Sequence, residues 1–188
     1  MKYLSLFILA VLFFITTAFS QSKFNLGASF NVNFPVGAFS DIAKTGIGGS
    51  VLGEYVFTEK ISAVILGSFN SYSSTIPRIA AGGSTYDISL TSIPVMAGVR
   101  YYFQPNLFAT IEAGVNFIRA SADVSNIYSK EKLSTDYSSK FSSGIGGGMR
   151  FNLSEQSVFE FAGTFNYVQD NFSTISLSAT VVILLGNL

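Results

Sequence analysis

Apolar and polar residues alternate along most of the chain beyond residue 23. Between Phe24 and Phe34, every even position is apolar and every odd position is Gly, Ser or Asn. This period of two is that of a β-strand with one apolar face and one small, polar face. No comparable stretch keeps a helical period, so the pattern predicts an all-β domain.

The same alternation recurs seven more times, which predicts eight strands. Their expected ranges are 24–34, 46–57, 61–72, about 86–103, 107–118, a strand containing 141–151, 157–168 and 172–185. Three connections are tight turns (58–60, 104–106 and 152–156), three are long polar loops (35–45, 73–85 and 119–137), and 169–171 is short. This layout predicts an eight-stranded antiparallel up-and-down barrel whose long loops gather at one end.

Residues 1–20 follow a different pattern. Lys2 precedes an apolar run that ends near Ile15, and the small-residue sequence Ala18-Phe19-Ser20 follows. The run is shorter than the roughly 20 apolar residues that a spanning helix needs. We therefore expect a cleaved secretory signal peptide over 1–20 and a barrel domain over 21–188.

The composition of the polar face indicates where the barrel resides. A barrel in water would carry many Lys and Glu residues on its outer face, whereas only 12% of this chain is charged. The polar face is instead Gly, Ser, Thr and Asn, which suits the crowded interior of a narrow barrel. The apolar face is then directed to lipid, which predicts a transmembrane barrel.

Aromatic residues gather near both ends of the predicted strands. Such clusters are typical of the two interfaces of a membrane, and they flank an aliphatic band here. The short-turn group is Phe24, Tyr55, Phe57, Tyr101, Phe103, Phe151 and Phe159, and the loop group is Phe34, Phe69, Phe117, Phe141, Phe165 and Tyr167.

Five charged residues lie on the predicted inner face: Glu54, Arg100, Glu112, Arg150 and Glu160. Each lies a few residues from a short turn, so we expect all five at a similar height in the lumen. Arg100 and Glu112 flank one hairpin and Arg150 and Glu160 flank another, which predicts cross-strand ion pairs. Because a buried unpaired charge is costly, we interpret the five as a structural charge cluster that plugs the lumen.

The stretch FSSGIGGGMRF (141–151) contains four glycines and resembles a phosphate-binding loop. It lacks the Gly-Lys-Ser/Thr ending of a P-loop, and no helix is predicted after it. In strand register, Gly144, Gly146 and Gly148 face inward beside Arg150. We interpret these glycines as the thin part of the barrel wall, where bulky side chains from other strands find room.

Two segments carry a resemblance to a known family: NFPVGAFSDIAKTGIGGSVLGEYVFTEKIS (33–62) and SIPVMAGVRYYFQPNLFATIEAGVNF (92–117). The chain resembles the small OmpA/OmpX-type outer-membrane barrels of Gram-negative bacteria, and more closely the outer membrane β-barrel domain proteins common in Bacteroidota. The resemblance implies an outer-membrane location, contact with lipid and lipopolysaccharide, and insertion by the barrel assembly machinery.

Candidate chemistry is sparse. The chain contains no histidine and no cysteine, which removes imidazole and thiolate catalysis. No cofactor motif or metal-ligand spacing occurs, and the balance of 11 basic against 11 acidic residues gives no reason to expect nucleic acid as a partner. We therefore expect a non-enzymatic barrel with a structural or surface-interaction role, whose long loops meet extracellular or surface proteins. A narrow channel or a carrier of small hydrophobic ligands is the alternative.

Overall fold

The chain forms a closed β-barrel in a computed structural model that describes residues 23–74, 85–125 and 130–185. The strands are β1 (Phe24–Pro35), β2 (Gly46–Val56), β3 (Ile61–Ser73), β4 (Thr85–Gln104), β5 (Leu107–Ser125), β6 (Lys130–Ser134), β7 (Ser138–Asn152), β8 (Ser157–Val168) and β9 (Thr174–Leu184). A short helix, α2 (Ala38–Ile42), and a 3-10 turn, η2 (Gln169–Asn171), interrupt them. The predicted signal peptide lies outside the described residues.

Eight of these strands close the ring. Their order around the barrel is β4-β3-β2-β1-β9-β8-β7-β5, and β4 pairs with β5 to complete it. All neighbours are antiparallel, and β1 pairs with β9 from Asn25↔Leu184 to Pro35↔Thr174. Closure leaves no sheet edge within the barrel, which a lipid environment requires because it offers no partner for an open backbone. The predicted eight-stranded antiparallel barrel is confirmed.

The outer face of the barrel is apolar, as the alternation predicts. Aliphatic residues at the middle of the strands, such as Val51, Ile111 and Ile145, are 60–66% exposed. The residues on either side of each point inward and are mostly buried. The described part of the chain contains no helix with the length and hydrophobicity that a membrane crossing requires.

Both predicted aromatic groups lie on this outer face. At the short-turn end, Tyr55 packs against Phe57 with ring centroids 5.0 Å apart, and Tyr101 packs against Phe103 at 5.1 Å, both edge to face. At the loop end, Phe69, Phe141 and other members of the group are likewise exposed. The arrangement is that of two interfacial belts around a hydrophobic band.

The region 119–137 is not a simple loop, which corrects the sequence prediction. Strand β5 continues to Ser125, and β6 pairs with it from Ser121↔Ser134 to Ser125↔Lys130. Strand β4 also continues beside β5 as far as Thr85↔Ser125. The alternation of apolar residues stops where the lipid-facing surface stops, but backbone pairing continues, because it needs neighbouring strands and not an apolar face.

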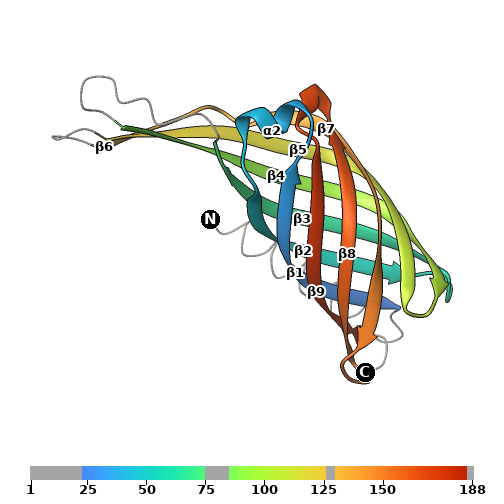
Figure 1. Cartoon of the computed structure of the whole chain (residues 1–188). Coiled ribbons are helices and arrows are strands. Elements are labelled where there is room, and N and C mark those ends of the chain that lie inside the picture. The colour runs from blue at the N-terminus through green and yellow to red at the C-terminus, as the bar shows by residue number, and fades with distance from the viewer. Residues whose placement is uncertain (1–22, 75–84, 126–129, 186–188) are drawn as a thin grey trace, which may run out of the picture.

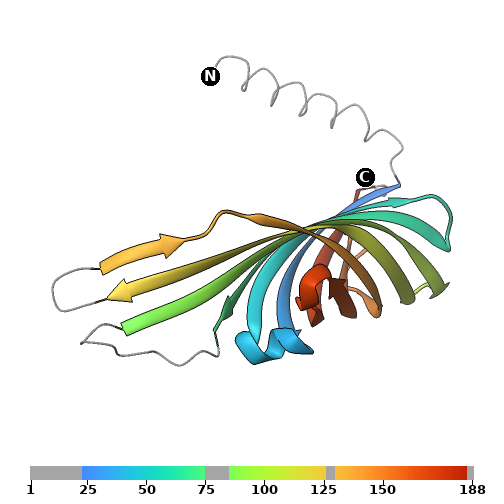
Figure 2. The same ribbon diagram turned by 90° about the horizontal axis from the view of Figure 1, so that it is seen from above.

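These extensions form an arm, which we define as residues 85–91 of β4, 119–125 of β5 and all of β6. Figure 1 shows β4 and β5 running well past α2 to meet β6. Figure 2 shows that the arm leaves the barrel on one side of its mouth and does not fold over it. The arm belongs to the end opposite the three tight turns.

Two further differences occur at the loop end. The 35–45 connection contains α2, and Phe172 precedes β9 where the alternation predicts strand. Asp170 and Asn171 have positive φ values of 61° and 64°, which turn the chain sharply before Phe172. Most of the predicted 73–85 connection lies outside the described residues.

The glycines of FSSGIGGGMRF lie where neighbouring strands approach closely. A Cβ on Gly148 would lie 2.6 Å from the Phe161 carbonyl oxygen and 2.7 Å from Cζ of Phe108. A Cβ on Gly146 would lie 2.4 Å from the Gly163 oxygen. The glycine run therefore forms a thin part of the barrel wall within β7, as the sequence predicts. The ring of Phe108 occupies the lumen beside it.

We expect Gly148→Ala to lower the free energy of unfolding by about 1–3 kcal/mol, because the methyl group overpacks against a backbone oxygen and a buried ring. The measurement is urea unfolding of the barrel in lipid vesicles. Gly67→Ala is the matched control, because its Cβ would have no neighbour closer than 3.8 Å. Equal midpoints for the two variants would contradict the thin-wall interpretation.

Candidate functional site

Four of the five predicted luminal charges meet inside the barrel. Glu54 lies on β2, Arg100 on β4, Arg150 on β7 and Glu160 on β8. Arg150 and Glu160 are direct cross-strand partners, while the other contacts cross the lumen. We call these four residues the luminal ion-pair network.

Glu54 is fully buried, and its two carboxylate oxygens accept hydrogen bonds from four side chains. Asn25 Nδ2 donates to its Oε2 at 2.9 Å, and Ser62 Oγ donates to its Oε1 at 2.7 Å. The Tyr102 hydroxyl donates to the same Oε1. Arg150 Nη2 reaches Oε2 at 2.7 Å and supplies the opposite charge. Such complete pairing is the condition under which a buried carboxylate is tolerated.

Glu160 is the second centre of the network and is 1% exposed. Arg150 Nε donates to its Oε1 at 2.6 Å, and Arg100 Nη1 donates to Oε2 at 3.0 Å. Arg100 Nη1 also lies 4.0 Å from Glu54 Oε1. Each arginine therefore lies between the two carboxylates, and the network joins four strands from opposite sides of the barrel.

Aromatic rings support both guanidinium groups. The Arg100 guanidinium carbon lies 4.4 Å from the centroid of the Phe108 ring, and that of Arg150 lies 4.8 Å from the centroid of Tyr102. A cation over an aromatic face is attracted by the ring quadrupole, most strongly where water is excluded. The two rings also pack together, with centroids 5.8 Å apart, and form a small buried cluster with Ala162.

The predicted pairing of Arg100 with Glu112 is wrong. Arg100 is opposite Thr110 in the β4–β5 register, and Glu112 is opposite Gly98, so the two are displaced by one inward position. Arg100 is directed to Glu160 instead. Glu112 is 7% exposed and accepts a hydrogen bond from Thr110 Oγ1 at 3.1 Å. No basic side chain of the described residues lies within 4.0 Å of it.

Sequence reasoning identified the charges but not their supporting residues. Asn25, Ser62, Tyr102 and Phe108 are all on the inner face. The period of two alone places Tyr102 on the inner face of β4 with Arg100, and Phe108 on the inner face of β5 with Glu112. What the period does not indicate is which inward residues from distant strands reach the same point.

A second inward group lies at the loop end of the barrel. Phe39 of α2 packs edge to face on Tyr72 at 5.2 Å and on Phe172 at 5.3 Å. Phe39 and Tyr72 are almost fully buried, and Leu90 packs against them. We call Phe39, Tyr72 and Phe172 the aromatic lid. The sharp turn before Phe172 is what directs its ring into this group and away from lipid.

The described residues contain no group of three or more His, Cys, Asp or Glu side chains placed to hold a metal ion. The lumen instead combines an ion-pair network, an aromatic lid and, between them, hydroxyl and amide side chains. This arrangement can bind small polar species and can obstruct passage along the barrel axis.

Comparison with known proteins agrees with the architecture. Residues 6–182 match the model of a family described as outer membrane protein beta-barrel domain. A search of curated proteins finds no significant match.

Among solved structures, Neisserial surface protein A superposes with a TM-score of 0.53 at 17% identity, over 87% of this chain and 97% of that one. Ail, the attachment invasion locus protein of Yersinia pestis, in complex with the heparin analogue sucrose octasulfate, gives 0.51 at 17% identity, over 86% and 96%. At this identity the likeness concerns the fold alone. Since the family model covers most of the chain, this protein belongs to the outer membrane β-barrel domain family and is a protein of the outer membrane.

Proposed function

We propose that the protein is a non-enzymatic outer-membrane barrel with a plugged lumen, which acts at the cell surface through its arm. The observation that carries this proposal is the arm itself, a sheet that continues beyond the membrane-spanning part of the barrel. Lipopolysaccharide and the barrel assembly machinery are further expected partners.

The luminal ion-pair network supports the plugged lumen. It spans the barrel from β2 to β7 through Glu54 and Arg150 and from β4 to β8 through Arg100 and Glu160, and three of its four members are buried. An eight-stranded barrel has an interior that side chains can fill, so little additional obstruction is needed. The lumen is lined by hydroxyl and amide side chains together with apolar ones such as Leu52 and Met96, so a hydrophobic ligand would leave several polar groups without partners.

The same network supports a non-enzymatic role. Glu54 and Glu160 each accept hydrogen bonds from arginine, so they are held as the partners of fixed cations. A carboxylate that shuttles protons needs contact with substrate, and these two are enclosed by side chains. With no histidine or cysteine in the chain, imidazole and thiolate catalysis are absent as well.

The arm has the features of a contact surface. Within the described residues, β6 pairs with β5 alone, so one of its edges carries unpaired backbone groups. Such an edge can accept an extended segment of another protein as an added strand. Leu133 on β6 is 55% exposed, while Tyr137, which follows β6, lies under Arg119 at 5.4 Å from the ring centroid. An exposed apolar side chain on a strand with an open edge suits contact with an extended protein segment.

For the network, we expect Arg150→Ala to lower the free energy of unfolding by about 3 kcal/mol, because it leaves two buried carboxylates under-paired. Urea unfolding in lipid vesicles at neutral pH measures this. Lys140→Ala is the matched control, since it removes a half-exposed pair with Asp170 and should cost less than about 1 kcal/mol. An unchanged midpoint for Arg150→Ala would count against the structural role.

For the plugged lumen, we expect purified monomer in a planar bilayer to show no steady conductance, because the ion-pair network crosses the lumen. Arg150→Ala, tested in the same bilayer, should conduct more than the wild type if the network is the obstruction. Steady conductance of the wild type would instead favour the alternative of a narrow channel.

For the arm, we expect a photoreactive residue at position 133 to cross-link a surface protein in intact cells, because Leu133 is exposed beside the open edge of β6. Position 153 is the matched control, since Leu153 is 61% exposed but lies in the tight turn after β7, at the opposite end of the barrel. Adducts at neither position, or the same adducts at both, would contradict a surface role for the arm.

A further inference from the structure

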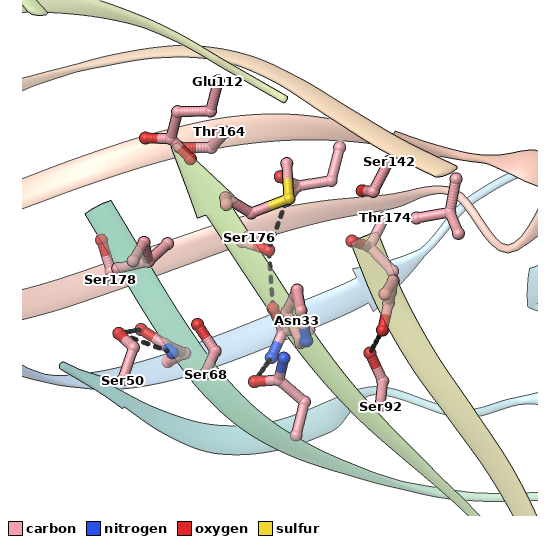
Figure 3. A pocket seen from close by; sticks show the side chains of 18 of the residues that line it. Asn33, Ser50, Ser68, Ser92, Glu112, Ser142, Thr164, Thr174, Ser176 and Ser178 are labelled. Carbon is pink, nitrogen blue, oxygen red and sulfur yellow. Dashed lines mark hydrogen bonds between the residues drawn. The ribbon is translucent and has the colours of Figure 1, made fainter. Parts of the chain in front are cut away.

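A cavity of about 90 Å³ lies in the lumen. Arg100 and Phe108 line it beside the luminal ion-pair network, and the aromatic lid lines it at the loop end. Most of the remaining lining is Ser, Thr and Asn, and Figure 3 shows Glu112 and Thr164 among these side chains. Since a water molecule needs only about 10–15 Å³ of such space, the cavity has room for a small hydrated species.

Glu112 is the one carboxylate that lines this cavity. Its register partners on both sides are glycines, Gly98 on β4 and Gly144 on β7, so no side chain flanks it in its row. Its carboxylate accepts a hydrogen bond from the Thr110 hydroxyl, a neutral donor. The carboxylate is therefore buried and directed inward, and no Lys or Arg side chain of the described residues lies within 4.0 Å of it.

The charges of the lumen do not balance when Glu112 is included. Arg100 and Arg150 are both engaged by Glu54 and Glu160, so these four sum to zero. Glu112 adds one negative charge that nothing in the described lumen offsets. Buried charges are as a rule paired or bound to a metal ion, because an isolated one is too costly.

Polar side chains of β8 lie beside Gly144, the β7 residue that pairs with Glu112. The Cβ that Gly144 lacks would lie 2.9 Å from Asn166 Oδ1 and 3.3 Å from Cγ2 of Thr164. Gly144 pairs with Glu112 on one side and with Asn166 on the other, so the amide oxygen and the carboxylate flank one glycine. Asn166 Nδ2 donates a hydrogen bond to Ser176 Oγ at 2.9 Å. The amide oxygen of Asn166 therefore points away from Ser176.

We propose that Glu112 is the charged ligand of a small monovalent cation such as Na⁺, held in this cavity with neutral oxygens that include the side-chain oxygen of Asn166. Carboxylate, hydroxyl and amide oxygens are the ligands that hard cations prefer. One carboxylate matches one positive charge, whereas a divalent ion would leave an excess charge buried. The proposal does not depend on a surface partner of the arm.

The test compares urea unfolding of the barrel in lipid vesicles in NaCl and in N-methyl-D-glucamine chloride at equal ionic strength. The organic cation is too large for the cavity. The unfolding equilibrium constant of the wild type should be about tenfold lower in NaCl, when the salt is present at ~10 times its dissociation constant. Glu112→Gln should show no difference between the salts.

Glu59→Gln is the matched control, because it removes the same charge from the exposed turn between β2 and β3 and should keep the wild-type response to Na⁺. If Glu112→Gln does not fold, Asn166→Leu serves as the second variant and should weaken the response. Saturable broadening of the ²³Na resonance by folded wild-type protein, reversed by excess K⁺, is the direct measure of binding.

Two results would overturn the proposal. One is an equal response to NaCl in the wild type and in Glu112→Gln, which would mean that Na⁺ acts elsewhere. The other is an equal stability of the wild type in both salts together with no ²³Na broadening, which would mean that no Na⁺ binds at Glu112.

Discussion

The closure of the sheet is the constraint on which the rest of the structure depends. In lipid each backbone group must find its partner within the protein, and a ring of eight antiparallel strands achieves this without an edge. Closure then gives every residue one of two environments, lipid outside or a narrow lumen inside. The apolar outer face, the aromatic belts and the crowding of polar groups in the lumen all follow from that division.

Because the lumen is narrow and largely buried, charged side chains inside it need partners of opposite charge. Two arginines reach two glutamates across it, and two rings lie against the guanidinium groups. At the loop end the aromatic lid packs through apolar contacts instead. A cavity lies between these two groups, so the barrel interior is divided into layers of different character and not filled uniformly.

The sequence predicts the parts of this molecule that repeat. Because lipid imposes a period of two, strand ranges such as Ser157–Val168, the facing pair Arg150 and Glu160, and the inward glycines of β7 are all deducible from it. It does not predict contacts that depend on the tilt and closure of the sheet. The meeting of Glu54 with Arg150 across the lumen and the displacement of Glu112 from Arg100 depend on register, which alternation leaves open.

The arm and the lid were missed for a different reason. Both lie beyond the lipid-facing band, where the apolar alternation ends and no single pattern replaces it. The pairing of β6 with β5 depends on backbone hydrogen bonds, and the packing of Phe172 on Phe39 depends on a sharp turn at Asp170 and Asn171. Neither feature leaves a periodic trace in the sequence.

The pairing of β1 with β9 has a consequence for how the barrel is made. Residues joined in this seam are as far apart as Ser29 and Thr180, separated by 151 positions along the chain. Every other seam of the ring joins strands that are much nearer in sequence, so those can form early and locally. Among the described strands, β9 comes last along the chain and is thus the one that abolishes both open edges; until it docks, the sheet remains unable to reside stably in lipid.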